Sequence, residues 1–215
     1  MPFPPLEHIF PGTLSLARVP IFARSGAFVT LTENRDSAFR VAVLTISDAG
    51  FRGERADSSG DAAAEWAEWQ GAAVVARSIV PDDTVEIVRV LLAWCDDDAA
   101  DLVLTTGGTG LSARDVTPEA TRAVIEREAD GIAERLRVLT GADFARAALS
   151  RGVCGVRNRT LIVNLPGSTN GVRETLAALV PIAKHAVDIL RGAATDHGIA
   201  VTSHDSRFTS HEKSR

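Results

Sequence analysis

Apolar and polar positions along the chain form blocks that predict strands separated by helices. Four short apolar runs are rich in β-branched residues, as in strands covered on both faces: 41–46, 72–80, 101–106 and 158–165. Five longer segments have apolar residues at helical spacing: 61–70, 81–95, 117–128, 131–140 and 170–190. Strands joined through helices form right-handed βαβ units, so we predict an α/β protein, a three-layer α/β/α sandwich with a mainly parallel central sheet.

Several residues predict where these helices begin. Ser58 or Ser59 is the candidate N-cap of the first helix, and Asp83 with Glu86 three residues later has the spacing of a capping box. Thr117 is the candidate cap of a later helix, because Pro118 suits the first helical position.

The two ends of the chain lack this alternation. Residues 1–40 hold five of the nine prolines and show no sustained period, although 26–32 (GAFVTLT) has the composition of a short strand or arm. Residues 193–215 are polar without an apolar face, which predicts a tail. We therefore expect one domain at 41–192, preceded by an N-terminal extension and followed by a polar tail.

Composition narrows the classes of function. The formal net charge of −5 means that the chain has no overall positive field to attract a polyanion, so we expect no nucleic acid as a partner. The two cysteines, Cys95 and Cys154, have neither zinc-ligand spacing nor the density of a disulfide framework, which favours a reducing cytoplasm. No apolar stretch approaches the roughly 18 residues of a membrane span, and the N-terminus lacks the pattern of a signal peptide. We expect a cytoplasmic protein without membrane contact.

In open α/β sheets, ligands bind outside the carboxyl ends of the strands. This rule selects four loops, each rich in Gly, Ser, Thr or Asp: 47–60, 81–83, 107–115 and 166–169.

The loop 107–115 (GGTGLSARD) admits several interpretations. It has no lysine, which excludes a Walker A loop. Gly108, Gly110 and Ala113 satisfy the dinucleotide pattern GxGxxA, but that motif opens a helix, whereas the helix signals here begin at Thr117, seven residues after Gly110. A third interpretation is a nest of backbone amides that binds an anion, beside a Mg²⁺ held by Asp115. The alternative without chemistry is a glycine-rich turn with an exposed aspartate.

Other acidic residues and the histidines refine this picture. Asp83 already provides a helix cap, so Asp82 is available to hold a Mg²⁺ together with Asp115. The run 96–98 (DDD) ends a helix and precedes a strand, so we place it at the far edge as a solvated turn without chemistry. Within 41–192 the only histidine is His185, inside a predicted helix, which disfavours a histidine base or nucleophile. The Asp, Gly, Ser and Thr residues of these loops instead favour a site that positions phosphates and stabilises their charge with a metal ion, as phosphoryl transfer requires.

Seven segments, in their order and spacing, resemble the MogA/MoaB molybdenum-cofactor family, which includes the G domain of gephyrin. They are TISD (45–48), DSSG (57–60), VPDD (80–83), LVLTTGGTGLSARDVTPEAT (102–121), VIERE (124–128), ALSRGVCGVRN (148–158) and LIVNLPGST (161–169). The resemblance spans about 41–192, and the TTGGTG and RDVTPEA element carries most of its specificity.

The resemblance implies a molybdopterin adenylyltransferase, in which Mg²⁺ and ATP activate molybdopterin to adenylyl-molybdopterin with release of pyrophosphate. The family's catalytic and metal-site aspartates fall on Asp82 and Asp115. Its nucleotide and pterin-phosphate loops fall on Ser47, Asp48, Thr106, Gly107, Gly108, Thr109, Gly110, Ser150, Arg151, Pro166, Gly167 and Ser168.

The resemblance also distinguishes between branches of the family. RDVTPE and PDD are kept, which favours the active branch over a non-catalytic one, whereas PGST at 166–169 departs from the family's PGN or PGQ. A homotrimer is implied, with a hexamer of two trimers as the alternative, and a downstream molybdenum insertase as a partner. A non-catalytic molybdopterin-binding scaffold stays open as a second function, and a nicotinamide-dependent oxidoreductase, resting on GxGxxA alone, as a third.

Overall fold

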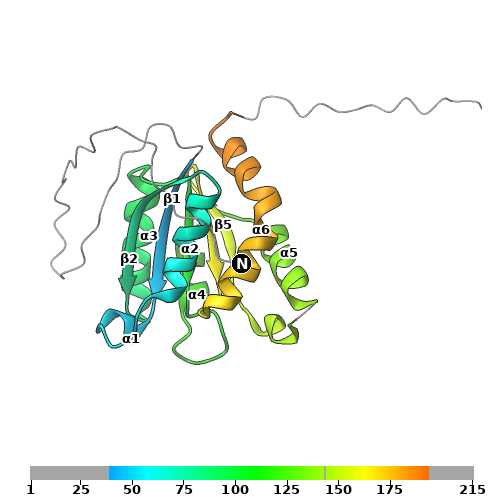
Figure 1. The fold of residues 1–215 in the computed structure, drawn as a ribbon. Coiled ribbons are helices and arrows are strands. Elements are labelled where there is room, and N and C mark those ends of the chain that lie inside the picture. Colours follow the sequence, from blue (N-terminus) through cyan, green and yellow to red (C-terminus); the bar gives the residue numbers. More distant parts are fainter. Residues whose placement is uncertain (1–38, 143, 194–215) are drawn as a thin grey trace, which may run out of the picture.

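A computed structural model describes residues 39–142 and 144–193 of the 215-residue chain. These residues form a six-stranded sheet with helices on both faces (Figure 1). The predicted strand or arm at 26–32 lies outside the described residues, as do nearly all of the predicted extension and tail. The predicted domain boundaries therefore stay predictions. Among the described residues, no helix combines the length and apolar character that crossing a membrane requires.

The strand order of the sheet is β2-β1-β3-β6-β5-β4. The four predicted strands are its parallel neighbours: β2 (Ala73–Val80), β1 (Arg40–Ile46), β3 (Leu102–Thr106) and β6 (Thr160–Leu165). Two antiparallel strands were not predicted, β5 (Cys154–Arg157) and β4 (Arg127–Glu128). They have four and two residues, too few to produce a recognisable alternation.

The helices form two layers, one on each face of the sheet (Figure 1). One core lies beneath α2 (Ser58–Trp69), α5 (Asp130–Gly141) and α6 (Thr169–Leu190). The other lies beneath α3 (Thr84–Asp96) and α4 (Thr117–Val124). The predicted three-layer α/β/α sandwich with a mainly parallel sheet is confirmed.

Strand β1 shows why its sequence is continuously apolar. Val43 belongs to the core under α2 and α6, whereas its neighbour Leu44 belongs to the core under α3, and both are at most 1% exposed. Successive side chains of a strand point to opposite faces, so a strand covered on both sides needs apolar residues at every position.

The helix starts differ in part from the predictions. Asp83 caps α3 as expected, since its carboxylate accepts hydrogen bonds from the amides of Val85 and Glu86. The reciprocal half of the capping box is absent, because the Glu86 carboxylate pairs with Arg89. For α2 the prediction of Ser58 or Ser59 was wrong, since Asp57 caps this helix by accepting from the amide of Gly60. A carboxylate one residue earlier reaches the same free amides.

Thr117 is not the cap of α4. The cap position is Val116, which makes no side-chain cap hydrogen bond, and the Thr117 hydroxyl donates instead to the carbonyl of Gly107. The prediction of Pro118 at the start of the helix is confirmed. Two short elements were not predicted, α1 (Asp48–Phe51) and the 3₁₀ helix η1 (Ala145–Leu149).

Both edges of the sheet carry clusters of polar residues. Because β1, β2, β3 and β6 are parallel, their ends share one edge, which we call the carboxyl edge. The antiparallel strand β5 begins at the same edge, where Cys154 pairs with Val163. At the opposite edge lies 96–98, as predicted, but Asp96 pairs with Arg157 and Asp98 with Arg40. This run is therefore an ion-paired turn and not simply a solvated one.

Candidate functional site

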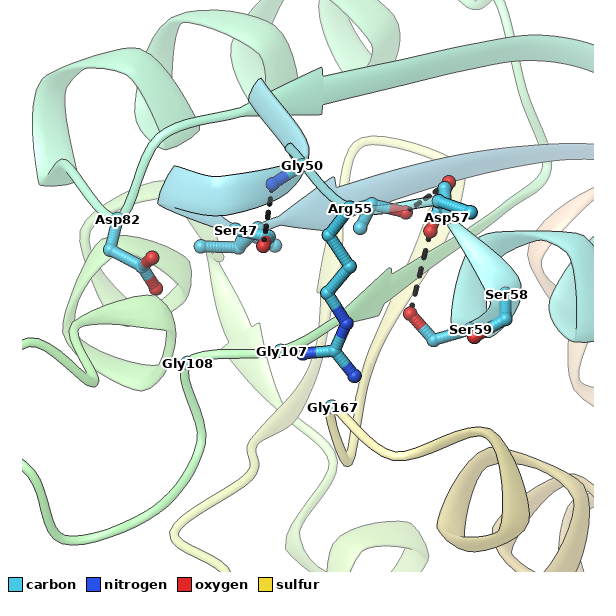
Figure 2. A pocket seen from close by; sticks show the side chains of 13 residues that line it. Ser47, Gly50, Arg55, Asp57, Ser58, Ser59, Asp82, Gly107, Gly108 and Gly167 are labelled. Carbon is cyan, nitrogen blue, oxygen red and sulfur yellow. Dashed lines mark hydrogen bonds between the residues drawn. The ribbon is translucent and has the colours of Figure 1, made fainter. Parts of the chain in front are cut away.

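The four loops selected from the sequence meet around one cavity at the carboxyl edge. It encloses about 180 Å³ and is shown in Figure 2. This volume is smaller than the roughly 300–1,000 Å³ of a typical small-molecule pocket, so a nucleotide would occupy it only in part. The lining residues are Thr45, Ile46, Ser47, Gly50, Arg55, Ala56, Asp57, Ser58, Ser59, Asp82, Gly107, Gly108 and Gly167.

Glycines form one wall because no larger residue fits. Gly107 has a φ of 98°, and a Cβ there would lie 2.2 Å from the carbonyl oxygen of Ile46. Gly167 approaches from the loop after β6, where a Cβ would lie 3.2 Å from the Gly107 Cα. Gly108 has a φ of 61°. Successive small residues in such conformations turn backbone amides towards one concavity, the arrangement that binds anions in nests.

Thr117 holds this glycine loop in place. Its hydroxyl donates to the Gly107 carbonyl at 2.9 Å, and its amide donates to the Gly108 carbonyl at 3.1 Å. Both carbonyls are thereby directed to the base of α4. The Gly108 amide donates to no group among the described residues and stays available to a ligand.

Asp48 and Asp82 connect the loops after β1 and β2. The Asp48 amide donates to Oδ2 of Asp82 at 2.9 Å, and the Asp82 amide donates to Oδ1 of Asp48 at 3.1 Å. Arg114 pairs with the other carboxylate oxygen of Asp48. The hydrogen bond from Arg114, followed by that from the Asp82 amide, lowers the pKa of Asp48 below its usual value. Asp48 is therefore an ionised link between three loops.

Ser47 lines the cavity and also begins α1. Its hydroxyl accepts a hydrogen bond from the Gly50 amide at 3.1 Å. The hydroxyl proton is not used in that bond and can be donated to a ligand.

Asp115 closes a turn beside the same glycine loop. Its Oδ2 accepts from the Ser112 amide at 2.7 Å and lies 2.9 Å from the position that a Cβ of Gly110 would take. Asp115 is not among the residues that line the cavity.

Arg151 is occupied by the protein itself. Its guanidinium donates to the carbonyls of Gly110 and Asp115 and pairs with Glu119, and its amide donates to the carbonyl of Thr109. In this structure Arg151 fixes the segment between the glycine loop and α4, and its charge is balanced by a carboxylate.

Asp82 and Asp115 are the predicted ligands of a Mg²⁺. Each carboxylate accepts one backbone amide through Oδ2, and its Oδ1 has no partner among the described residues. Among residues 39–142 and 144–193, three or more His, Cys, Asp or Glu side chains nowhere gather as metal ligands. Mg²⁺ is commonly held by one or two carboxylates with substrate phosphates and water, so each residue has the chemistry of a ligand. That the two hold one Mg²⁺ together stays a prediction.

The opposite wall of the cavity is the start of α2, which lies in the selected loop 47–60, although none of its residues was predicted to bind a ligand. Asp57 accepts from the Gly60 amide and the Thr45 hydroxyl, both at 2.9 Å. The Ser58 hydroxyl lies 2.8 Å from that of Thr169, which joins the starts of α2 and α6. The signal that could have found Asp57 is its residue type, because aspartate is a preferred N-cap and Asp57 directly precedes the predicted cap serines.

Thr106 precedes the glycine loop and is fully buried, yet its hydroxyl has no hydrogen-bond partner among the described residues. By strand register it lies beside Thr45, which lines the cavity. An unsatisfied buried hydroxyl is unfavourable unless a ligand or water supplies a partner.

The remaining predicted site residues lie around the cavity. Ser168 caps α6 by accepting from the Gly171 amide. Ser150 and Pro166 line a second cavity of about 40 Å³, next to α5. Five predicted residues thus line the main cavity: Ser47, Asp82, Gly107, Gly108 and Gly167. The others lie in adjoining segments, and their assignment to a ligand stays a prediction.

Comparisons with known proteins show what the chain is similar to. Residues 42–185 match a family described as a probable molybdopterin binding domain. A molybdopterin adenylyltransferase of Helicobacter pylori (strain J99) is 38% identical over 154 residues, which cover 71% of this chain and 88% of the relative. The molybdenum cofactor synthesis protein cinnamon of Drosophila melanogaster is 41% identical over 149 residues, which cover 67% of this chain but 25% of that protein. The crystal structure of the molybdopterin biosynthesis enzyme MoaB from Thermus thermophilus has a TM-score of 0.68 and 50% identity, covering 72% of this chain and 97% of MoaB.

Proposed function

The chain belongs to the MogA/MoaB family of molybdenum cofactor biosynthesis, and from this premise we propose that it is a molybdopterin adenylyltransferase. It would transfer AMP from ATP to the terminal phosphate of molybdopterin, giving adenylyl-molybdopterin and pyrophosphate. The observation that carries the proposal is the cavity at which all four loops of the carboxyl edge converge, with two aspartates and two glycine loops in its wall. The relative named as an adenylyltransferase covers most of the chain and supports the reaction type.

The proposed step is a substitution at phosphorus. An oxygen of the molybdopterin phosphate forms a bond to the α-phosphorus of ATP, and the bond from that phosphorus to the bridging oxygen of the β-phosphate breaks. Pyrophosphate leaves with the electron pair. The attacking phosphate is already anionic at neutral pH, so the step needs no general base, and the described residues offer no histidine at the carboxyl edge.

The residues of this chain would supply positioning and charge compensation. The amides of Gly107 and Gly108 would hold phosphoryl oxygens, and Ser47 would donate a hydrogen bond to one of them. Asp82 and Asp115 would hold a Mg²⁺, which neutralises charge between the two anionic reactants when bound. The predicted homotrimer and a downstream insertase stay part of this proposal.

The purified full-length chain, incubated with molybdopterin, ATP and Mg²⁺, tests the proposal. We expect adenylyl-molybdopterin and pyrophosphate to form in equal amounts, measured by mass spectrometry and a coupled pyrophosphate assay. Tight binding of molybdopterin without ATP-dependent product would contradict the enzyme and support the non-catalytic scaffold.

A further inference from the structure

The cavity contains one positive side chain that the sequence analysis did not select. Among the described residues that line it, Arg55 alone is basic. Arg55 belongs to the segment between α1 and α2, and in Figure 2 its guanidinium points into the cavity towards Gly107 and Gly167.

Arg55 differs from the other arginines near the carboxyl edge because it has no partner among the described residues. Arg52, Arg77, Arg114 and Arg151 each pair with a carboxylate. The side chain of Arg55 makes no hydrogen bond or ion pair with any described residue. Its charge and its five N–H donors are therefore free to meet a ligand.

The acidic residues in the cavity do not account for Arg55. Asp57 already accepts hydrogen bonds from Thr45 and Gly60 and lies 3.4 Å from Arg77. Asp82 accepts from the Asp48 amide. Neither carboxylate contacts Arg55, so the guanidinium is not retained as a counter-ion for either of them.

The groups around Arg55 are suited to an anion. The Ser58 and Ser59 hydroxyls, the glycine loop and the available Gly108 amide surround the same space. A planar guanidinium bonds a phosphoryl group through two parallel hydrogen bonds, a geometry that a single amide or hydroxyl cannot provide.

We propose that Arg55 binds a phosphoryl group of the substrate in this cavity and is the residue that contributes positive charge to it. This inference rests on the proposed function for the identity of the phosphate ester, but the binding itself can be measured without turnover. Three phosphates are candidates: the α-phosphate of the nucleotide, its β- and γ-phosphates, and the terminal phosphate of molybdopterin.

Isothermal titration of the full-length chain with AMP, with pyrophosphate and with molybdopterin, each with Mg²⁺, distinguishes these sources. We expect Arg55→Ala to weaken at least one of them by about tenfold or more, since a charge-assisted contact is lost. Arg55→Lys keeps the charge but not the paired donors and should fall between Arg55→Ala and the unaltered protein. Binding that depends on Arg55 should also weaken as salt is added.

Arg52→Ala is the matched control. Arg52 lies three residues earlier in the same exposed segment, pairs with Glu54 and does not line the cavity. Its replacement should change all three affinities by less than about twofold, because only its surface ion pair is lost. Thermal denaturation should give all of these variants nearly the melting temperature of the unaltered protein.

The outcomes separate this inference from the proposed function. If Arg55→Ala binds all three ligands as the unaltered protein does, or if the unaltered protein binds none of them, the role of Arg55 is refuted. If Arg55-dependent binding is found but no adenylyl-molybdopterin forms, the inference stands and the proposed reaction fails.

Discussion

Asp48 and Asp82 exchange two hydrogen bonds, each backbone amide donating to the carboxylate of the other residue, at 2.9 and 3.1 Å. This reciprocal pair joins the loop after β1 to the loop after β2 and fixes one carboxylate oxygen of Asp82. The other oxygen of Asp82 is left towards the glycine loop, 3.4 Å from the position that a Cβ of Gly108 would take. Asp48 thus positions Asp82, which lines the cavity.

Replacing Asp48 should loosen Asp82 without removing a residue that lines the cavity. We expect Asp48→Ala to lower kcat of adenylyl transfer by about 10- to 100-fold, since a displacement of about 1 Å has effects of that order. The Mg²⁺ concentration that gives half-maximal rate should rise. Asp48→Asn keeps the oxygen that accepts from the Asp82 amide and should retain more activity than Asp48→Ala. Equal loss in both variants would show that the reciprocal bond is not the relevant contact.

The proposed metal ligands can be tested against a neighbouring carboxylate. Asp82→Asn and Asp115→Asn should each lower adenylyl transfer by about 100-fold or more, because the amide replaces an anionic oxygen ligand of Mg²⁺. Asp83→Asn is the control, since Asp83 caps α3 and asparagine caps helices about as well. Steady-state rates over a Mg²⁺ series provide the measurement. An Asp115 variant with full activity would remove Asp115 from the metal site.

The glycine loop should not tolerate a methyl group. Gly107→Ala places a Cβ 2.2 Å from the Ile46 carbonyl oxygen at a φ of 98°, so we expect a loss of about 2 kcal/mol or more in the free energy of unfolding. Gly131→Ala is the control, because nothing lies within 4 Å of its Cβ position and it lies in the first turn of α5 with an ordinary φ. That variant should be stabilised by about 0.4–1 kcal/mol. Urea denaturation measures both, and a Gly107→Ala variant as stable as the unaltered protein would contradict the loop geometry.

Asn164 joins the sheet to the segment that carries Arg151. Its Nδ2 donates to the hydroxyls of Thr105 and Thr121, and its Oδ1 accepts from the buried Val153 amide. Asn164→Ala leaves these groups without partners and should lower the free energy of unfolding by about 2–4 kcal/mol. Asn170→Ala, an exposed substitution on α6, should change it by less than about 0.5 kcal/mol. Similar unfolding midpoints in urea for the two variants would argue against the network.

Acid stability should depend on Asp101, whose side chain is 3% exposed beside Arg40. Burial alone raises the pKa of this carboxyl, but the hydrogen bonds from Arg40 outweigh burial and the net pKa is lowered. A carboxyl with a lowered pKa in the folded state stabilises the protein above its unfolded pKa of about 3.9. That stabilisation is lost as the pH falls through the lower folded value.

Asp101→Asn should therefore be less stable at pH 7 and lose less additional stability between about pH 5 and pH 2 than the unaltered protein. Asp97→Asn changes an exposed carboxyl at the end of α3 and should keep the pH profile of the unaltered protein. Urea midpoints at several pH values provide the comparison. An unchanged acid profile in Asp101→Asn would show that another carboxyl is responsible.

Local chemistry was sufficient to predict most of the framework. The four apolar runs are the four parallel strands of the structure. A strand covered on both faces is apolar at every position, which makes it easy to recognise in the sequence. The rule that ligands bind at the carboxyl ends then selected four loops, and each contributes to the cavity. Strands β4 and β5 were missed because pairing, of β5 with β6 and of β4 with β5, and not their own sequence, makes them strands.

The sequence by itself determined the strand and helix alternation, the glycine loop and the aspartates beside it, because these follow from periodicity and residue type. Only the tertiary structure decided which polar groups are already used. Arg151, predicted for a phosphate, is bound to Glu119 and two carbonyls. Arg55 lies in a selected loop but was not singled out there, and its guanidinium is unpaired with any described residue at the cavity. Whether a charge is paired depends on residues distant in sequence, since Arg151 meets Glu119 only because the segment before β5 lies at the carboxyl edge.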